Sequence, residues 1–463
     1  MKKPILFILA AVALITVVDC GKAAPQEAII KINPNEKFQT ITGWEATAQA
    51  GEIHAKAFDK YKENLFDEAV YDLGINRLRL EIRSGAENPE DFFTEYVSGR
   101  INEKQFRSHY YEIINDNDDP FSINEKGFNF SELDSTIEKV VLPIKKRLAA
   151  RGEKLFLNLN YIDFLKGRGA SDIRHKTNAE EYAEFMQAAF LHMRQKYDLV
   201  PDAIEVILEP DNRTGWTGTD IGRAIVATAK RLGKNNFNPT FIAPSTTNAA
   251  NTTVFIDEIA DVPGAMQFIS EFSYHRYCCA SEKVLRQIAE RAEKYNKQTA
   301  MLEWIGADYK TLHEDLKTAR NSAWQQYTLA FPDQPDNGAQ YYRIDDEVLD
   351  NPVITLGSRT KFLRQYFHFI HAGAQRIGAE TSNKALDPLA FINKNGRYVV
   401  VIKADARGTV LVENLPAGNY GISYMTSEQA GFDAPDKTIK ANEPLKAQIP
   451  AVGVLTIYAK TDS

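Results

Sequence analysis

Two glutamates in this sequence each follow a short apolar run. Glu209 follows residues 204–208, and Glu303 follows residues 299–302. Apolar runs of this length are typical of buried strands, so each glutamate is expected at the end of a strand. Two carboxyls brought together there can take unequal roles, because desolvation can keep one protonated while the other stays ionised to attack an electrophilic carbon. Glu209 and Glu303 are therefore candidate catalytic residues.

The pair is more diagnostic than either glutamate alone. A single glutamate at a strand end often caps a helix or forms a salt bridge with a neighbouring loop. Two carboxyls that flank a glycosidic bond can cleave it, with retention of configuration at a separation of roughly 5 Å and with inversion across a wider gap that admits a water. The separation of the two carboxyls therefore decides which reaction the pair could perform.

Eight alternating units of strand and helix are expected to position these glutamates. Short β-branched or aromatic runs predict strands at residues 40–44, 76–82, 154–160, 203–209, 240–243, 268–275, 298–303 and 339–344. Apolar residues that recur every three or four positions predict helices, most clearly at residues 180–197, 221–232, 281–295, 312–328 and 358–371. Alternating strands and helices indicate a parallel sheet, and eight units in this length predict a (β/α)8 TIM barrel over residues 39–373.

The pattern changes after Gly373. Residues 398–403, 408–412, 418–425 and 453–459 are expected to form strands separated by turn residues, with no helix between them. Residues 28–32 also have the pattern of a strand and are expected to join this sheet. An antiparallel β-sandwich built from residues 26–38 and 374–461 is therefore predicted beside the barrel. The long segment at residues 84–135 follows the second strand and is expected to shape a substrate site.

The N-terminus has the order of residues typical of an export signal. Lys2 and Lys3 precede an apolar run at residues 4–18, which is short for a membrane span. Residues 1–24 are therefore expected to be a signal peptide. Cleavage near Ala24 would release a secreted or periplasmic protein, whereas lipidation of Cys20 would give a surface-anchored lipoprotein. Both remain open, and Cys20 is the only expected membrane attachment.

Composition excludes several other functions. The net charge of −7 among 463 residues argues against a nucleic-acid partner, which would need a basic face. The adjacent Cys278 and Cys279 cannot link distant segments, so no disulfide framework is expected. The 8 histidines form no recognisable zinc motif, and no glycine-rich phosphate loop or Gly-x-Ser-x-Gly turn occurs. We therefore expect no metal and no cofactor.

Three segments carry a resemblance to glycoside hydrolase family 30. Residues 39–44 (Gln-Thr-Ile-Thr-Gly-Trp) resemble the opening motif of that family, and Glu209-Pro210-Asp211 resembles its acid/base turn. Residues 369–377 are similar to the segment that leads into its β-sandwich. The resemblance covers residues 28–460. It implies a retaining β-glycosidase with Glu209 as acid/base and Glu303 as nucleophile, acting on a polysaccharide, oligosaccharide or glycoconjugate.

The resemblance also suggests residues that would assist the two glutamates. Arg79 matches an arginine near the nucleophile, although an ordinary interstrand ion pair explains it equally well. His275 and Tyr277 close the sixth predicted strand, where the family places a hydrogen-bond donor to the nucleophile. Tryptophans in loops at a barrel mouth would pack on sugar rings. The further substrate-binding candidates are Trp44, Asn212, Trp216 and Trp304, whereas Trp324 is expected in the core inside a helix.

Two departures from the family pattern leave other functions open. Leu208 stands where an asparagine would contact the sugar 2-hydroxyl. Three explanations are open: Asn212 or Asn248 supplies the missing donor, the substrate has a different group at that carbon, or activity is lost. Glu45 stands where a glycine is expected and is either a third carboxylate of the cleft or the partner of an arginine. A surface glycan-binding lipoprotein without turnover is the main alternative function. A barrel enzyme of unrelated chemistry would apply if the two glutamates lay far apart.

Overall fold

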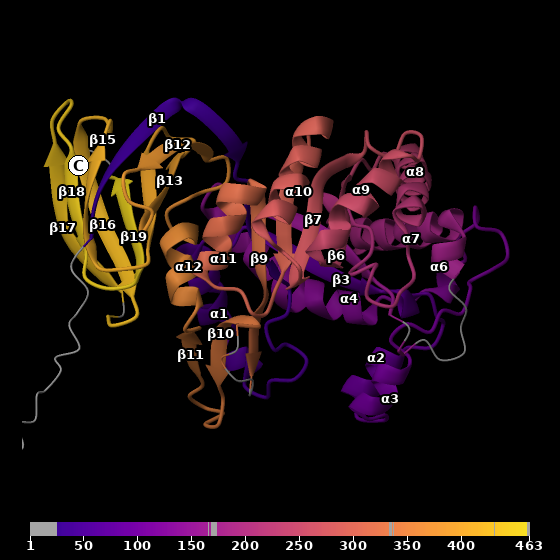
Figure 1. The fold of residues 1–463 in the computed structure, drawn as a ribbon. Coiled ribbons are helices and arrows are strands. Elements are labelled where there is room, and N and C mark those ends of the chain that lie inside the picture. The colour runs from indigo at the N-terminus through magenta and orange to yellow at the C-terminus, as the bar shows by residue number, and fades with distance from the viewer. Residues whose placement is uncertain are drawn as a thin grey trace, which may run out of the picture.

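The computed structural model of the protein describes residues 26–164, 166–167, 174–332, 336, 338–429 and 431–460. The predicted signal peptide, with Cys20 and Ala24, lies outside these residues. A barrel surrounded by helices occupies one end of the molecule, and a β-sheet domain that carries the C-terminus occupies the other (Figure 1). None of the helices in the described ranges is long and apolar enough to cross a membrane.

The barrel is closed by eight parallel strands, which confirms the predicted (β/α)8 class. Its last strand pairs with both β8 and β2 and so closes the ring. Closure gives each of the eight strands two neighbours within the barrel. In order, the strands are β2 (Gly43–Thr47), β3 (Arg77–Arg83), β4 (Phe156–Ile162), β5 (Ala203–Glu205), β6 (Thr240–Asn248), β7 (Ile269–Cys278), β8 (Gln298–Glu303) and β9 (Asn321–Pro332).

Amphipathic helices cover the outside of the barrel. Four of the five predicted helices are present, as α7 (Ala179–Tyr197), α8 (Gly218–Lys234), α10 (Glu282–Tyr295) and α12 (Thr360–Phe367). Helix α8 begins with a capping box between Thr217 and Asp220, which satisfies its first backbone N–H groups. Shorter or unpredicted helices complete the layer: α1 (Phe58–Asp67), α5 (Leu142–Ala150), α6 (Arg174–Thr177), α9 (Thr252–Ala260) and α11 (Tyr309–Glu314).

The eighth barrel strand is not where the sequence pattern predicts it. The predicted helix at residues 312–328 is wrong beyond Ala319, because Arg320 adopts a left-handed conformation (φ 55°) and β9 follows at once. Strand β9 is covered on both faces, so it lacks the alternating pattern of a half-exposed strand. The predicted strand at residues 339–344 is β10 (Gln340–Asp345), which pairs with β9 outside the barrel and with β11 (Val353–Leu356).

The barrel interior is polar on the side of β3. Leu78, Leu80 and Ile82 belong to the main hydrophobic core beneath the helices, so the intervening charged residues of β3 face the lumen. The first of them, Arg77, is buried and donates to Glu45 Oε2 (2.7 Å) and Glu271 Oε1 (3.0 Å). Glu45 is thus the ion-pair partner of a buried arginine rather than an available carboxylate of the cleft.

The C-terminal domain is a nine-stranded sheet that contains one N-terminal strand. Strand β1 pairs antiparallel with β12 and parallel with β15, so the predicted antiparallel sheet is mixed. A parallel pair needs a long crossover, and here the entire barrel lies between β1 and β15 in the chain. The strands are β1 (Gln26–Thr40), β12 (Gln375–Thr381), β13 (Leu386–Ile392), β14 (Tyr398–Ala404), β15 (Gly408–Glu413), β16 (Gly418–Thr426), β17 (Phe432–Ile439), β18 (Leu445–Ile449) and β19 (Gly453–Ala459).

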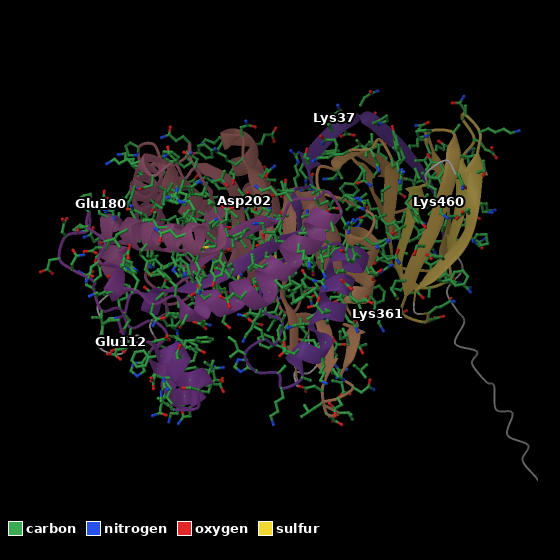
Figure 2. The ribbon with its side chains drawn as sticks, turned by 180° about the vertical axis from the view of Figure 1, so that it is seen from behind. Lys37, Glu112, Glu180, Asp202, Lys361 and Lys460 are labelled. Atoms are coloured by element: carbon green, nitrogen blue, oxygen red, sulfur yellow. A yellow bond between two sulfur atoms is a disulfide. The ribbon has the colours of Figure 1, made fainter. Side chains whose placement is uncertain are left out.

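Strand β1 and helix α12 join the two bodies. The register of β1 shifts on both sides of Lys37, which lies on the arch that carries the chain from the sheet to the barrel (Figure 2). Helix α12 packs against β16 and β19. Val399 and Val401 of β14 belong to the same hydrophobic cluster as the barrel core. The β domain is therefore packed against the barrel through a continuous apolar core.

The predicted long loop after the second barrel strand is partly helical. It contains α2 (Phe92–Val97), α3 (Glu103–Ser108) and, at its end, α4 (Ser131–Thr136). Helices α2 and α3 form a small lobe at the edge of the barrel (Figure 1), and Glu112 marks its position from behind (Figure 2). This lobe extends one wall of the barrel mouth.

Candidate active site

Glu209 and Glu303 lie together at the carboxyl ends of the barrel strands. Glu303 is the last residue of β8, and Glu209 follows β5 in a left-handed conformation (φ 53°) that non-glycine residues seldom adopt. One carboxylate oxygen of each glutamate and one ring nitrogen of His275 all lie within 4.8 Å of one another. This proximity favours a retaining pair, whose carboxyls are typically roughly 5–5.5 Å apart, over an inverting pair, whose carboxyls are typically roughly 6.5–9.5 Å apart.

Two donors from different strands hold the carboxylate of Glu303. Arg79 Nη2 donates to Oε2 at 2.6 Å, and the Tyr277 hydroxyl donates to Oε1 at 2.9 Å. The guanidinium of Arg79 is fully buried and is fixed further by Thr47 Oγ1 at 3.1 Å. Burial raises the pKa of the Tyr277 hydroxyl, and the nearby charge of Glu303 raises it further. Both groups can therefore act as fixed hydrogen-bond donors to a negatively charged Glu303.

Glu209 has a different environment. His275 Nδ1 lies 3.0 Å from Oε1, and Asn212 Nδ2 donates to Oε2 at 2.7 Å. Burial alone would raise the pKa of Glu209, but the hydrogen bond and charge of His275, together with Asn212, outweigh it and lower the pKa.

The pKa of His275 shifts in the opposite direction. Its burial lowers the pKa, yet the hydrogen bond that His275 donates to Glu209 and the charges of Glu303 and Glu209 outweigh burial and raise it. The two shifts agree in favouring an ionised Glu209 beside a protonated His275. The hydrogen bond between them is therefore a route by which a proton could reach the carboxyl of Glu209.

The predicted site residues fall into two groups. Arg79, Asn212, His275 and Tyr277 each contact one of the two glutamates. Trp304 follows Glu303 directly and is half-buried, with its ring 5.8 Å from the guanidinium of Arg276. The other two predicted tryptophans lie elsewhere.

Trp216 and Trp44 are core residues rather than walls of the cleft. Trp216 is buried and packs edge-on against Tyr161 and Tyr182. Trp44 lies inside β2, stacks on Phe367 of α12 (ring centroids 4.3 Å apart) and donates from Nε1 to a backbone carbonyl at 2.8 Å. Trp324, predicted inside a helix, is a buried residue of β9. An indole in the sequence does not specify whether its ring faces solvent or core.

Replacing Trp44 with Phe separates these two roles. We expect the free energy of unfolding to fall by about 2 kcal/mol, because the smaller ring leaves a cavity and an unpaired carbonyl. Catalytic efficiency on any substrate should stay within about twofold of the native value, since the ring does not reach the cleft. Urea unfolding and steady-state kinetics on the same preparation measure both. A large rise in KM with unchanged stability would instead show that Trp44 contacts the substrate.

A cavity beside the glutamates is lined in part by residues that were not predicted from the sequence. It has a volume of about 260 Å³ and is bounded by β2, β3, β9 and the 84–135 segment. Arg79, which contacts Glu303, forms part of its wall, whereas neither catalytic candidate lines it. Its aromatic and charged lining includes Glu81, Arg83, Tyr96, Tyr110, Tyr327 and Phe331. Tyr327 escaped notice because it lies within the predicted helix at residues 312–328, and Phe331 because no strand was predicted there.

Leu208 offers no hydrogen bond at the position of the expected asparagine. Its side chain packs with Tyr111 and Ile162 in a small apolar cluster that anchors the 84–135 segment. Asn248 uses its side-chain oxygen to accept from the Ala250 backbone (3.0 Å) and so caps a local turn. Of the two proposed replacement donors, only Asn212 contacts a catalytic candidate.

The two glutamates and His275 could also form a cation site, since Glu209, His275 and Glu303 could each offer one ligand atom. Arg79 counteracts this, because its guanidinium lies 2.6 Å from Glu303 and would repel a cation. Two carboxylates that already accept four hydrogen bonds are better suited to proton and group transfer than to metal binding.

Comparison with known proteins identifies the fold. No protein-family model matches the sequence, and no curated protein sequence does. Solved structures do match. A family 30 xylanase C from Talaromyces cellulolyticus superposes with a TM-score of 0.66 at 13% identity, over 94% of this chain and 100% of that one.

Two further structures extend this likeness. A family 30 endoxylanase from Clostridium papyrosolvens gives a TM-score of 0.64 at 17% identity, over 93% of this chain and 100% of that one. An endo-β-1,6-glucanase gives 0.59 at 14% identity, over 94% of both chains. The chain therefore has the fold of family 30 glycoside hydrolases, and the structures it resembles include xylanases and a glucanase.

Proposed function

We propose that this protein is a retaining β-glycosidase in which Glu303 is the nucleophile and Glu209 the acid/base. The observation that carries the proposal is that one oxygen of each carboxyl lies within 4.8 Å of the other at the mouth of a family 30-like barrel. The two glutamates also have different hydrogen-bond partners, which suits two different roles. Glu303 is held by an arginine and a phenol, whereas Glu209 shares a proton with a histidine.

The reaction has two displacements. Glu303 attacks the anomeric carbon, the glycosidic C–O bond breaks, and the leaving oxygen takes a proton from Glu209. Glu209, now ionised, removes a proton from a water that attacks the same carbon and releases Glu303. The sugar leaves with its original configuration, and one water is consumed.

His275 supplies the proton in this scheme. An ionised Glu209 cannot act as an acid, so the proton on His275 Nδ1 must first pass to the Glu209 oxygen 3.0 Å away. It moves on to the leaving oxygen as that oxygen gains charge. In the second displacement the proton from water returns to the Glu209–His275 pair, which restores the starting state.

The substrate is a polysaccharide, an oligosaccharide or a glycoconjugate. The cavity beside Arg79 combines aromatic rings with carboxylates, the groups that pack on sugar C–H faces and accept hydrogen bonds from hydroxyls. Arg79 lines this cavity and contacts Glu303, so the cavity adjoins the proposed nucleophile. We further propose that the protein acts after export, on the basis of residues 1–24.

A glycan-binding protein without turnover is the second candidate. Leu208 favours it, because the expected hydrogen bond to the sugar 2-hydroxyl has no donor at this position. Such a protein would keep the aromatic cavity and bind sugar equally well after replacement of either glutamate.

A substrate panel distinguishes the two candidates. Purified mature protein is incubated with aryl β-glycosides and β-linked polysaccharides, and the anomer released first is identified by proton NMR. Release of the β-anomer supports the retaining glycosidase, and first release of the α-anomer would contradict the proposed mechanism. If every substrate remains intact while glycans bind to the native protein, the binding function replaces the enzymatic one.

A further inference from the structure

One strand supplies contacts to both catalytic candidates. His275 of β7 bonds to Glu209, and Tyr277 of the same strand donates to Glu303 at 2.9 Å. Strand β7 ends one residue later, at Cys278, which forms a disulfide with Cys279. The covalent link therefore lies immediately beside the residue that holds the proposed nucleophile.

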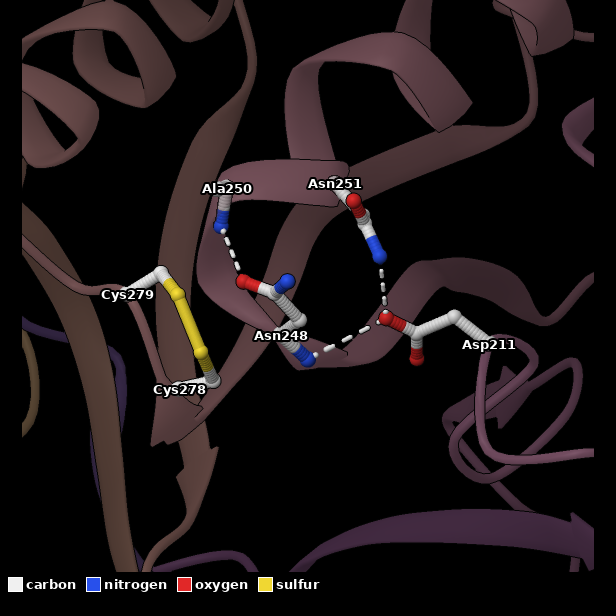
Figure 3. The surroundings of a disulfide bond; sticks show 6 residues. All are labelled: Asp211, Asn248, Ala250, Asn251, Cys278 and Cys279. Carbon is white, nitrogen blue, oxygen red and sulfur yellow. Dashed lines mark hydrogen bonds between the residues drawn. A yellow bond between two sulfur atoms is a disulfide. The ribbon is translucent and has the colours of Figure 1, made fainter.

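The disulfide also adjoins the support of Glu209. Cys278 is paired with Asn248 at the end of β6, and Asp211 accepts from the backbone of Asn248 (3.2 Å) and from Asn251 Nδ2 (2.8 Å). Figure 3 shows the Cys278–Cys279 bond beside this group. Asp211 is two residues from Glu209. The end of β7 thus adjoins the loop that carries Glu209, and it contacts Glu303 through Tyr277.

Global stabilisation does not explain this bond. The stability gained from a disulfide increases with the length of chain that it closes, so a link between neighbours contributes little. Its effect is local. Cys279 is held in a left-handed conformation (φ 60°), which is unfavourable for a residue with a side chain, and both cysteines are exposed at the surface. The bond therefore fixes the turn that ends β7.

We infer that the Cys278–Cys279 disulfide is a positioning element for catalysis, which keeps Tyr277 on Glu303 and makes the activity sensitive to thiols. This inference rests on the proposed glycosidase function. A dithiol reductant attacks one sulfur as its thiolate, forms a mixed disulfide and closes on itself. Two electrons and two protons pass to the protein, leaving two cysteine thiols. The turn after Tyr277 is then free to relax, and the hydrogen bond to Glu303 is lost.

The test compares native protein before and after dithiothreitol, with the state of the cysteines followed by mass spectrometry. Reduction is expected to lower kcat about tenfold, the effect of losing one hydrogen bond to a charged group, and to leave KM almost unchanged. The double variant Cys278→Ser/Cys279→Ser should match the reduced protein and show no response to dithiothreitol. If this variant does not fold, the comparison of oxidised and reduced native protein is sufficient for the test.

Tyr277→Phe shows whether the disulfide acts through the tyrosine. This variant should lose activity to a similar degree and lose no more on reduction, because the two changes remove the same contact. Equal kcat in oxidised and reduced native protein would overturn the inference, as would a further equal loss on reducing Tyr277→Phe. Either result leaves the proposed glycosidase intact, because it requires measurable activity in the oxidised protein. Absence of activity in the oxidised protein would instead remove the proposed function, and the inference with it.

Discussion

Replacing Glu303 with Gln is expected to lower kcat by about 10⁴-fold or more, since the amide cannot form the glycosyl ester on which a retaining mechanism depends. KM should change little, because Gln keeps the size of the side chain and still accepts a hydrogen bond from Tyr277. Initial rates on the best substrate of the aryl β-glycoside panel measure the effect.

Glu314→Gln is the matched control for this experiment. Glu314 forms an ion pair with Arg276 at 2.7 Å and touches neither Glu209 nor Glu303 in the described contacts. Its replacement should leave kcat within about twofold of native. Circular dichroism of Glu303→Gln guards against a folding defect, because this variant leaves the buried Arg79 without its closest counter-charge. A correctly folded Glu303→Gln that retains most of its activity would exclude Glu303 as the nucleophile.

The barrel could be predicted from the sequence because most of its helices have one clearly apolar face. Helices α7 and α10 were predicted to within two residues at each end. The prediction failed at β9, where the buried polar residues Gln325 and Gln326 interrupt the apolar run. A strand covered on both faces has no period of two to recognise, so the helical spacing of Leu312, Leu316 and Ala319 was extended too far.

The β domain was predicted less completely for a related reason. Strand β14 carries four consecutive apolar residues and was recognised, whereas β17 is mostly exposed and reads as a polar segment. The position of β1 in the sheet was expected, but its parallel pairing with β15 was not. Pairing direction depends on where the intervening chain runs in space, and residue types do not encode it.

The catalytic candidates and the residues that contact them could be named from the sequence, but the pairing between them could not. A carboxylate that directly follows an apolar run is a local signal, and it placed Glu209 and Glu303 at strand ends. Which donor serves which glutamate depends on distances between strands. Tyr277, not His275, reaches Glu303, while His275 bonds to Glu209. The shared proton, which determines how Glu209 could act as an acid, follows only from that pairing.

Replacing Glu209 with Gln is expected to lower kcat by about 10²- to 10⁴-fold on substrates with poor leaving groups, the usual range for a general acid. Substrates with an activated leaving group, such as 2,4-dinitrophenyl glycosides, should lose much less in the first displacement, because that oxygen departs without a proton. Rates across a series of aryl glycosides of increasing phenol pKa measure this dependence. A loss that is equal for all leaving groups would show that Glu209 does not donate the proton.

The pH dependence of native protein and Glu209→Gln provides a second test of the same role. The Glu209–His275 pair must hold one proton to act, and the raised pKa of His275 keeps that proton bound above the usual histidine range. Native kcat/KM should therefore persist above the pH at which an unperturbed histidine deprotonates and fall as the pH rises through the shifted pKa. In Glu209→Gln this alkaline decrease should disappear, because the residual reaction no longer uses the proton. An unchanged decrease in the variant would place the proton donor elsewhere in the cleft, and the assignment of Glu209 would then fail even if Glu303 proved essential.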